Sequence, residues 1–324
     1  MKKQLLALCA ALTLTIPAAL AGPTSLTSAQ GLTINGLQAG STFSVTLRQS
    51  DNKAQNSVKV TIDERLKPYL VVTVSGGILK LGFEDLPRNL QNSSKWSCPA
   101  TAEVTLSRVD RLIVSGMASI RPEGAFSGSA GQLKASGMSK IGPITIAVIG
   151  SQTSDINVSG MSKADITLQG GNGAAVRISG QAKLSLDCGT VQSLDIEASG
   201  MSNATVKGGA PTMETKCSGQ SELSLDCGTI RSLTVTTSGM ASATVTGTAE
   251  SVTAEASGNS RIDLKELKAQ RVKCGTSGMS GISCYPTVSL AASASGNSSV
   301  RYRAGGALQT QLRKSGMSSI STLN

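Results

Sequence analysis

A Ser-Gly dipeptide recurs at nearly constant intervals along roughly the last two thirds of the chain. The intervals between successive pairs are 21, 23, 20, 20, 19, 20, 19, 20, 18 and 20 residues. The pairs begin at Ser115, Ser136, Ser159, Ser179, Ser199, Ser218, Ser238, Ser257, Ser277, Ser295 and Ser315. Such a period is typical of a solenoid, in which each unit buries its apolar face only against its neighbours.

The segments between the Ser-Gly pairs alternate between apolar and polar residues. Ala182, Leu184 and Leu186 are apolar, whereas the intervening Lys183 and Ser185 are polar. A period of two predicts a β-strand with one buried and one exposed face. Glycine tolerates positive φ and close backbone contact, so the glycine of each pair is expected at a corner of a coil. These corner glycines include Gly116, Gly160 and Gly200. The sequence therefore predicts an all-β solenoid of about 20-residue repeats.

The length of one coil is left open by the sequence. Over most of the array the residue after Ser-Gly alternates between methionine and an amide, in the order Met161, Gln181, Met201, Gln220, Met240, Asn259, Met279, Asn297 and Met317. Either each coil has about 20 residues and the two kinds alternate, or each has about 40 and they form separate ladders. Cys188 and Cys227 occupy equivalent places 39 residues apart. Long coils would bring them to about 4.8 Å, within disulfide reach, whereas short coils would leave them about 9.6 Å apart, too far to bond.

Residues 22–105 lack the Ser-Gly rhythm and are predicted to cap the solenoid of residues 106–324. Alternating stretches at 32–37, 43–48, 58–62 and 70–83 indicate strands, followed by a longer loop that Trp96 is expected to pin. A solenoid needs such a cap, because an open first coil exposes unpaired backbone groups.

Residues 1–21 are predicted to be a signal peptide. Two lysines follow Met1, an apolar stretch runs from Leu5 to Leu20, and small residues precede Gly22. The stretch is shorter than the roughly 20 residues that a membrane-spanning helix needs. We therefore expect cleavage and an exported protein in the periplasm, at the cell surface or outside the cell, without a transmembrane segment in its mature chain.

The cysteines of the mature chain are candidate site residues. Six remain after the signal peptide, and an even number in an exported chain makes them candidates for disulfides. They are Cys98, Cys188, Cys217, Cys227, Cys274 and Cys284. The chain has no histidine and no C-x-x-C pair, which argues against zinc. The absence of histidine also removes Ser-His-Asp and Cys-His catalysis, so no catalytic residue, metal site or cofactor is predicted.

Charge and composition limit the classes of binding partner that can be expected. Two of the 30 basic residues lie in the signal peptide, which leaves 28 against 20 acidic residues and a net charge of +8. This balance favours a weakly anionic partner, such as an acidic glycan, or a surface protein. Aromatic residues are 2% of the chain, too few for base stacking, so nucleic acid is not an expected partner.

Several stretches resemble the bacterial head GIN domains of the autotransporter adhesin family. They are Leu32-Thr-Ile-Asn-Gly, Phe43-Ser-Val-Thr-Leu-Arg-Gln, Gly77-Ile-Leu-Lys-Leu, Leu112-Ile-Val-Ser-Gly with the Ser-Gly turns that follow, Val300-Arg-Tyr-Arg-Ala-Gly and Lys314-Ser-Gly-Met-Ser-Ser-Ile. The resemblance covers roughly residues 30–320. It implies a right-handed, single-stranded β-helix in a surface or envelope setting, but no established activity.

Three rows of side chains have both a structural and a chemical interpretation. Some β-helices cleave polysaccharides with paired carboxylates, which directs attention to Asp165, Asp187, Asp226 and Asp263. Seven methionines follow Ser-Gly and could hold copper(I), but packing into uneven corners of the core is the favoured interpretation. The amides at Gln181, Gln220, Asn259 and Asn297 are interpreted as a structural ladder of stacked side-chain hydrogen bonds.

The sequence thus favours a non-catalytic exported envelope or surface protein that binds a glycan, matrix or protein partner. A structural scaffold of the envelope is the first alternative, and a polysaccharide-cleaving β-helix is the second. The oligomeric state and the ligand are not predicted.

Overall fold

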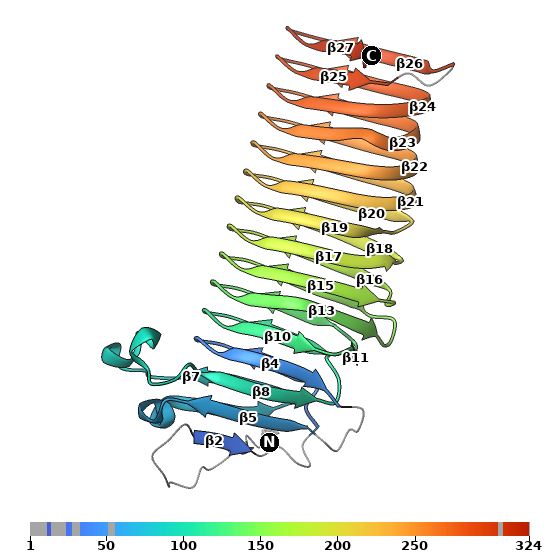
Figure 1. Ribbon diagram of the computed structural model, residues 1–324. Coiled ribbons are helices and arrows are strands. Elements are labelled where there is room, and N and C mark those ends of the chain that lie inside the picture. The colour runs from blue at the N-terminus through green and yellow to red at the C-terminus, as the bar shows by residue number, and fades with distance from the viewer. Residues whose placement is uncertain (1–11, 14–23, 28–32, 51–55, 304–306, 324) are drawn as a thin grey trace, which may run out of the picture.

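The protein is a long stack of β-strands, closed at its N-terminal end by a small cap (Figure 1). This computed structural model describes residues 12–13, 24–27, 33–50, 56–303 and 307–323. The predicted β-solenoid is confirmed. The predicted signal peptide lies outside the described residues, except for Leu12 and Thr13, which form β1 (Leu12–Thr13).

Each coil contains two strands joined by a Ser-Gly turn. In one coil these are β14 (Thr153–Val158) and β15 (Lys163–Gln169), and in the next β16 (Gly173–Ile178) and β17 (Lys183–Thr190). β14 pairs in parallel with β16, and β15 with β17, with Lys163 opposite Lys183. A register shift of 20 residues between neighbours shows that a coil has about 20 residues. The alternative of 40-residue coils is thereby excluded.

We call the strands before the Ser-Gly turns sheet I and those after them sheet II. Sheet I continues through β9 (Arg111–Val114), β12 (Gln132–Ala135), β14, β16, β18 (Ser193–Ala198) and β20 (Thr212–Cys217). Sheet II continues through β10 (Ser119–Glu123), β11 (Phe126–Gly128), β13 (Lys140–Val148), β15, β17 and β19 (Asn203–Gly209).

In the following coils one long strand bends from sheet II into sheet I. These strands are β21 (Glu222–Thr237), β22 (Ser242–Ala256), β23 (Arg261–Thr276) and β24 (Gly281–Ala294). The last coils contain β25 (Ser299–Tyr302), β26 (Gln309–Lys314) and β27 (Ser319–Thr322).

The core lies between the two sheets, where inward side chains stack into rows. One row of sheet II alternates small and large residues in successive coils, as Ala164, Leu184, Ala204, Leu223 and Ala243, all of them buried. Adjacent coils of different bulk interdigitate at native packing density. The small residues belong to coils whose turn carries methionine and the large ones to coils whose turn carries an amide. The super-repeat of about 40 residues is therefore a pair of short coils.

The Ser-Gly turns require glycine for two reasons. Gly160 has φ +73°, in the left-handed region that favours glycine. A Cβ at this position would also lie 2.5 Å from the Gly137 carbonyl oxygen, because the turns of neighbouring coils stack directly on each other. The prediction that these glycines form coil corners is confirmed, and together they make one continuous edge, which we call the Ser-Gly edge.

A second serine, three residues after the first, fills the inside of many turns. Ser280 is buried, and its hydroxyl donates to the carbonyl oxygens of Ser277 and Ala256, each at 2.9 Å. Ser260 and Ser298 each bond to the serine of their own turn at 2.8 Å. These three hydroxyls are buried on the interior side of the edge, where each satisfies its own hydrogen-bonding capacity with backbone carbonyls of the turn.

Strands from early in the sequence also join the parallel stack. Along sheet I the order is β7 (Ile78–Phe83), β3 (Gly36–Ala39) and β9; along sheet II it is β8 (Thr101–Leu106), β4 (Ser44–Gln49) and β10. β6 (Leu70–Ser75) runs antiparallel to β7, and β5 (Ser57–Ile62) antiparallel to β8. β1 and β2 (Thr24–Thr27) add to β6 and β5. The antiparallel strands cover the edges of the first coil.

The cap also holds three short 3-10 helices, η1 (Glu64–Tyr69), η2 (Arg88–Leu90) and η3 (Ser93–Lys95). Asp63 caps η1 and is buried; its carboxylate accepts from the Arg65 guanidinium at 2.6 Å and from the Ser97 amide at 2.6 Å. These bonds hold the pKa of Asp63 well below its usual range, the Arg65 hydrogen bond contributing most and outweighing the opposing effect of burial.

Trp96 fixes the segment before β8, as its position in the sequence predicts. Its ring meets Phe83 edge to face at 5.7 Å, and its indole N–H donates to the Leu90 carbonyl at 2.8 Å. Phe83 in turn stacks on Phe43 at 5.0 Å, so the segment is joined to the coil that β4 belongs to.

Candidate functional site

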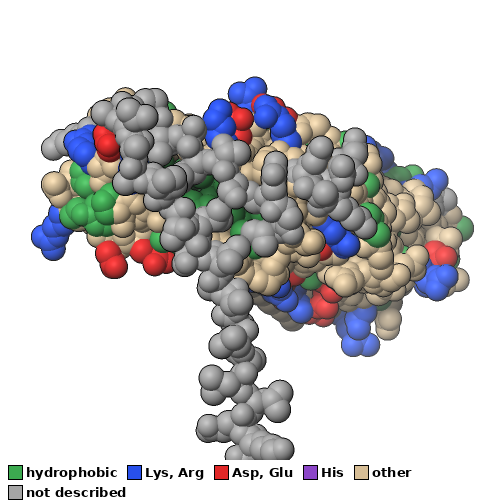
Figure 2. All heavy atoms as spheres, turned by 90° about the horizontal axis from the view of Figure 1, so that it is seen from below, with side chains coloured by type: hydrophobic (Ala, Val, Ile, Leu, Met, Phe, Trp, Pro, Cys, Tyr) green, Lys and Arg blue, Asp and Glu red, His purple; other side chains and the backbone are tan. Residues whose placement is uncertain are grey.

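The outer face of sheet I divides into two parts with different electrostatics. In its middle part, charges of opposite sign neutralise one another: Asp155 contacts Arg177 at 3.2 Å, and Arg177 contacts Glu197 at 3.6 Å. Lys216 contacts Glu214 at 2.8 Å, and this hydrogen bond raises the pKa of the lysine. Figure 2, which views the molecule from its N-terminal end, likewise shows basic and acidic side chains interspersed around the rim.

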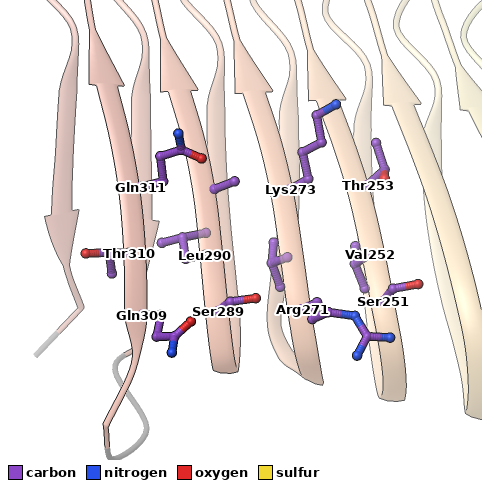
Figure 3. A pocket seen from close by; sticks show the side chains of 12 residues that line it. Ser251, Val252, Thr253, Arg271, Lys273, Ser289, Leu290, Gln309, Thr310 and Gln311 are labelled. Carbon is purple, nitrogen blue, oxygen red and sulfur yellow. The ribbon is translucent and has the colours of Figure 1, made fainter.

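Toward the C-terminal end the same face carries a groove that we call the distal groove. Its volume is about 470 Å³, and it crosses β22, β23, β24 and β26. The strand register creates it: one row across the four strands contains Ser251, Arg271, Ser289 and Gln309, and the next contains Thr253, Lys273, Ala291 and Gln311. Figure 3 shows Arg271 and Lys273 extending from the same face of β23, beside Ser289, Gln309 and Gln311. Hydroxyl, amide and cationic groups therefore converge along one open surface.

The charge of the distal groove is uncompensated. Arg271 and Lys273 are exposed, and neither forms an ion pair with any residue that the structure describes. No acidic or aromatic side chain belongs to the lining of this groove. Arg313 lies at the margin, where it lines a smaller depression together with Lys273 and Gln311. The arrangement can bind anionic oxygens through guanidinium and ammonium groups and neutral hydroxyls through serine, threonine and glutamine.

The six cysteines are free thiols in the structure, which gives no support to a disulfide. Cys188 and Cys227 are two coils apart, with Lys207 opposite both Asp187 and Asp226 in the coil between them. In a stack of 20-residue coils, Cys188 and Cys227 are therefore too far apart to form a disulfide. Cys98 is half-buried and lies in the cap, and the other five cysteines lie in the core.

Burial makes these core thiols poor nucleophiles. It raises the pKa of Cys188 to about 11 and that of Cys217 to about 12. It likewise raises the pKa of Cys227 to about 11. The pKa of Cys284 is also raised, first by its hydrogen bond with the Cys274 thiol and then by burial. Because the thiolate is the reactive form, the core cysteines form no nucleophilic site.

The four aspartates considered as paired carboxylates do not come together. Lys207 separates Asp187 from Asp226, and its ammonium group lies 4.0 Å from the Asp187 carboxylate. Asp165 lies opposite Ser185, and Asp263 lies opposite Thr244. No two of these four carboxylates lie directly opposite each other in adjacent coils.

Two sequence interpretations of the Ser-Gly edge are wrong. The seven methionines do not pack into the core: their exposed fractions range from 51% at Met117 to 81% at Met317. The amides at Gln181, Gln220, Asn259 and Asn297 form no stacked ladder, because a methionine coil separates each from the next. The side chain after Ser-Gly projects outward, and the buried place in the turn belongs to the following residue, such as Ser162 or Ala182.

Sequence reasoning missed the distal groove. The alternation in residues 271–273 places Arg271 and Lys273 on one outward face, and this could have been predicted from the sequence. Their alignment with Ser289 and Gln309 could not have been predicted, because the irregular register between Leu264 and Arg271 breaks the repeat there.

Several solved structures are similar to this chain over nearly its whole length. A "putative adhesin" of Parabacteroides merdae is 14% identical, covers 93% of this chain and 96% of its own, and has a TM-score of 0.37. A "putative lipid binding protein" of Parabacteroides distasonis is 15% identical, covers 93% and 97%, and has a TM-score of 0.35. A "putative adhesin" of Bacteroides fragilis is 14% identical, covers 93% and 97%, and has a TM-score of 0.29. No curated protein matches the chain.

Within the described residues, no helix has the length and apolar character needed to cross a membrane. The family model "Putative auto-transporter adhesin, head GIN domain" matches residues 34–209, 143–245 and 196–306, in overlapping segments that cover most of the solenoid. The chain therefore belongs to the head GIN domain family.

Proposed function

We propose that this protein is a non-catalytic, exported binding protein of the cell envelope or surface, and that its distal groove binds an anionic glycan. The observation that carries the proposal is the pair Arg271 and Lys273, which lie uncompensated among hydroxyl and amide side chains. The adhesin description of the family agrees with a role in binding.

The chemistry of the distal groove fits an acidic polysaccharide. A guanidinium group binds a carboxylate or sulfate through two parallel hydrogen bonds, and the ammonium of Lys273 adds a second positive charge 2 residues along the same strand. Serine, threonine and glutamine side chains can exchange hydrogen bonds with sugar hydroxyls. The groove is open and crosses four strands, which suits a chain molecule better than a small enclosed ligand.

The test is binding of the mature protein to polygalacturonate and heparin, with dextran as the uncharged control, by isothermal titration calorimetry. The acidic polymers should bind and dextran should not, and binding should weaken as salt rises, because exposed charges are screened. The double variant Arg271→Ala/Lys273→Ala should bind at least about tenfold more weakly, which corresponds to about 1.4 kcal/mol.

A matched control separates the distal groove from general positive charge. Lys163 and Lys183 lie opposite each other on the exposed face of sheet II and line none of the grooves on sheet I. Lys163→Ala/Lys183→Ala removes the same charge and should retain binding. Equal losses in both variants would contradict a specific groove, and release of reducing or unsaturated ends from the polymer would contradict a non-catalytic role.

A further inference from the structure

The Ser-Gly edge carries three methionines in consecutive coils at its N-terminal end. Met117, Met138 and Met161 follow one another directly, because the Met138 amide donates to the Gly116 carbonyl at 2.7 Å and the Met161 amide to the Gly137 carbonyl at 2.7 Å. Their exposed fractions are 51%, 52% and 57%, so the three thioethers lie on the surface in one row.

The spacing of this row suits a shared metal ion. Neighbouring strands in a sheet are about 4.8 Å apart. Two sulfur atoms bonded to one ion at about 2.3 Å, the length of a zinc–sulfur bond, lie at most about 4.6 Å apart. Adjacent coils thus present thioethers at nearly the right separation, and the three rotatable bonds of methionine allow the outer two to lean toward the middle one.

The remaining methionines provide a natural contrast. Met201, Met240 and Met279 are exposed on the same edge, but an amide coil separates each from the next. Their spacing is therefore about 9.6 Å, two strand intervals, and an amide side chain instead of a third thioether lies between each pair. Only the first three turns of the Ser-Gly edge bring thioethers together in adjacent coils.

We propose that Met117, Met138 and Met161 form a binding site for a soft monovalent metal ion, Cu(I) or Ag(I). Thioethers are neutral, soft ligands that select Cu(I) over hard or divalent cations. The site is separate from the distal groove and does not depend on the proposed glycan.

The core thiols do not compete for the ion in the native protein. The five core cysteines are buried and out of reach of the surface row, and burial raises the pKa of Cys188, Cys217 and Cys227. Thioethers do not titrate, so metal binding at the edge should be equally strong at pH 5 and pH 7.5, unlike binding by thiolate ligands.

The experiment is an anaerobic titration of the full mature chain with Cu(I), in competition with bicinchoninate, in a Cys98→Ser background, because the half-buried thiol of Cys98 would otherwise bind the ion. We expect one ion per chain at both pH values. Met117→Leu/Met138→Leu/Met161→Leu should lower the affinity at least tenfold, whereas the matched control Met201→Leu/Met240→Leu/Met279→Leu should leave it unchanged. Leucine keeps the bulk of the side chain, and circular dichroism checks that both variants retain their strands.

A second measurement needs no methionine variant. In the Cys98→Ser protein labelled with [13C-methyl]methionine, one equivalent of Ag(I) should shift three methyl resonances and leave the others in place. Equal losses in the two triple variants, retention in both, or methyl shifts spread over the whole edge would each overturn the proposal. Failure of the Cys98→Ser protein to withdraw Cu(I) from bicinchoninate would overturn it as well.

Discussion

At the scale of single residues, the stacked glycines set the stability of each turn. Gly180 has φ +74°, and a Cβ there would lie 2.6 Å from the Gly160 carbonyl oxygen. Gly180→Ala therefore combines backbone strain with a clash against rigid backbone, and should lower the free energy of unfolding by more than about 2 kcal/mol. Urea unfolding followed by circular dichroism measures this loss.

Gly189 provides the control within the same coil. It has φ +58°, but no atom lies within 4 Å of the position of its Cβ. Gly189→Ala should lower the free energy of unfolding by only about 1 kcal/mol, the cost of the left-handed backbone conformation alone. Equal costs at Gly180 and Gly189 would show that the stacking of turns contributes nothing beyond backbone strain.

Asp63 gives the cap a dependence on pH. Its pKa is lowered in the folded protein, mainly by Arg65, so its bonds contribute full stability above the unfolded value of about 3.9 and lose it as pH falls below that. Asp63→Asn should lower the free energy of unfolding by about 2 kcal/mol at pH 7, with the difference from wild type shrinking toward pH 3. Urea midpoints between pH 3 and 7 test this, and a difference that stays constant with pH would contradict it.

At the scale of the strand and turn, the methionines of the Ser-Gly edge should be open to oxidation. Hydrogen peroxide should convert Met117, Met201 and the other exposed methionines to sulfoxides without loss of strand content, because they contribute nothing to the core. Met213, on β20, is 1% exposed and should be spared. Peptide mass spectrometry reads out each site, and equal oxidation of Met213 would show that the coils open on the time scale of the reaction.

The cysteines make a parallel prediction for the strands of the core. In the native protein only Cys98 should react quickly with Ellman's reagent, while the five buried thiols should react after denaturation in urea. Non-reducing proteolysis should yield no peptide that links Cys188 to Cys227, because they lie two coils apart. Recovery of that link would require a different stacking of the coils.

The strands of each coil could be predicted from the sequence, whereas the orientation of the turn residues could not. Alternation around Leu184 and Leu186 is enough to predict strands and their buried face, since a period of two continues along the whole strand. The period stops at the turn, so nothing in the sequence says whether Met161 faces in or out. The hydrophobicity of methionine suggested a buried position for Met161. Instead, Ser162 takes the buried position in the turn, and its hydroxyl donates a hydrogen bond to the Ser159 carbonyl oxygen.

At the scale of the whole molecule, the paired coils predict tolerance to the loss of one pair. Deletion of residues 200–238 joins Ser199 to Gly239 and lets β22 take the place of β19, so that Ala243 replaces Ala204 opposite Leu184 and the alternation of small and large residues is kept. The shortened protein should fold, with a Tm within a few degrees of the full chain. A ten-residue deletion in the same region would exchange the sheets and should abolish cooperative unfolding, whereas equal behaviour of the two would contradict the two-strand coil.

The division into a cap at residues 22–105 and a solenoid at 106–324 also belongs to this scale, and we retain it as a proposal. Strands β3, β4, β7 and β8 share the parallel ladders, whereas β5 and β6 run antiparallel across the first coil. The sequence could not show this, because β3 and β4 stack between strands that follow them in the chain. The cap is therefore interleaved with the stack, and its removal should expose the edges of β9 and β10, which pair with β3 and β4, to aggregation.

Because every coil has the same height, the length of the molecule is proportional to its number of coils. Every added or lost repeat moves the distal groove by one strand interval of about 4.8 Å relative to the cap, while all core contacts within the remaining coils stay the same. A duplication of one repeat in the gene would thus lengthen the reach of the protein in a single step without a new fold. The distance between the cap and the distal groove is then determined by the number of repeats. Recombination between similar segments of the gene can readily change that number.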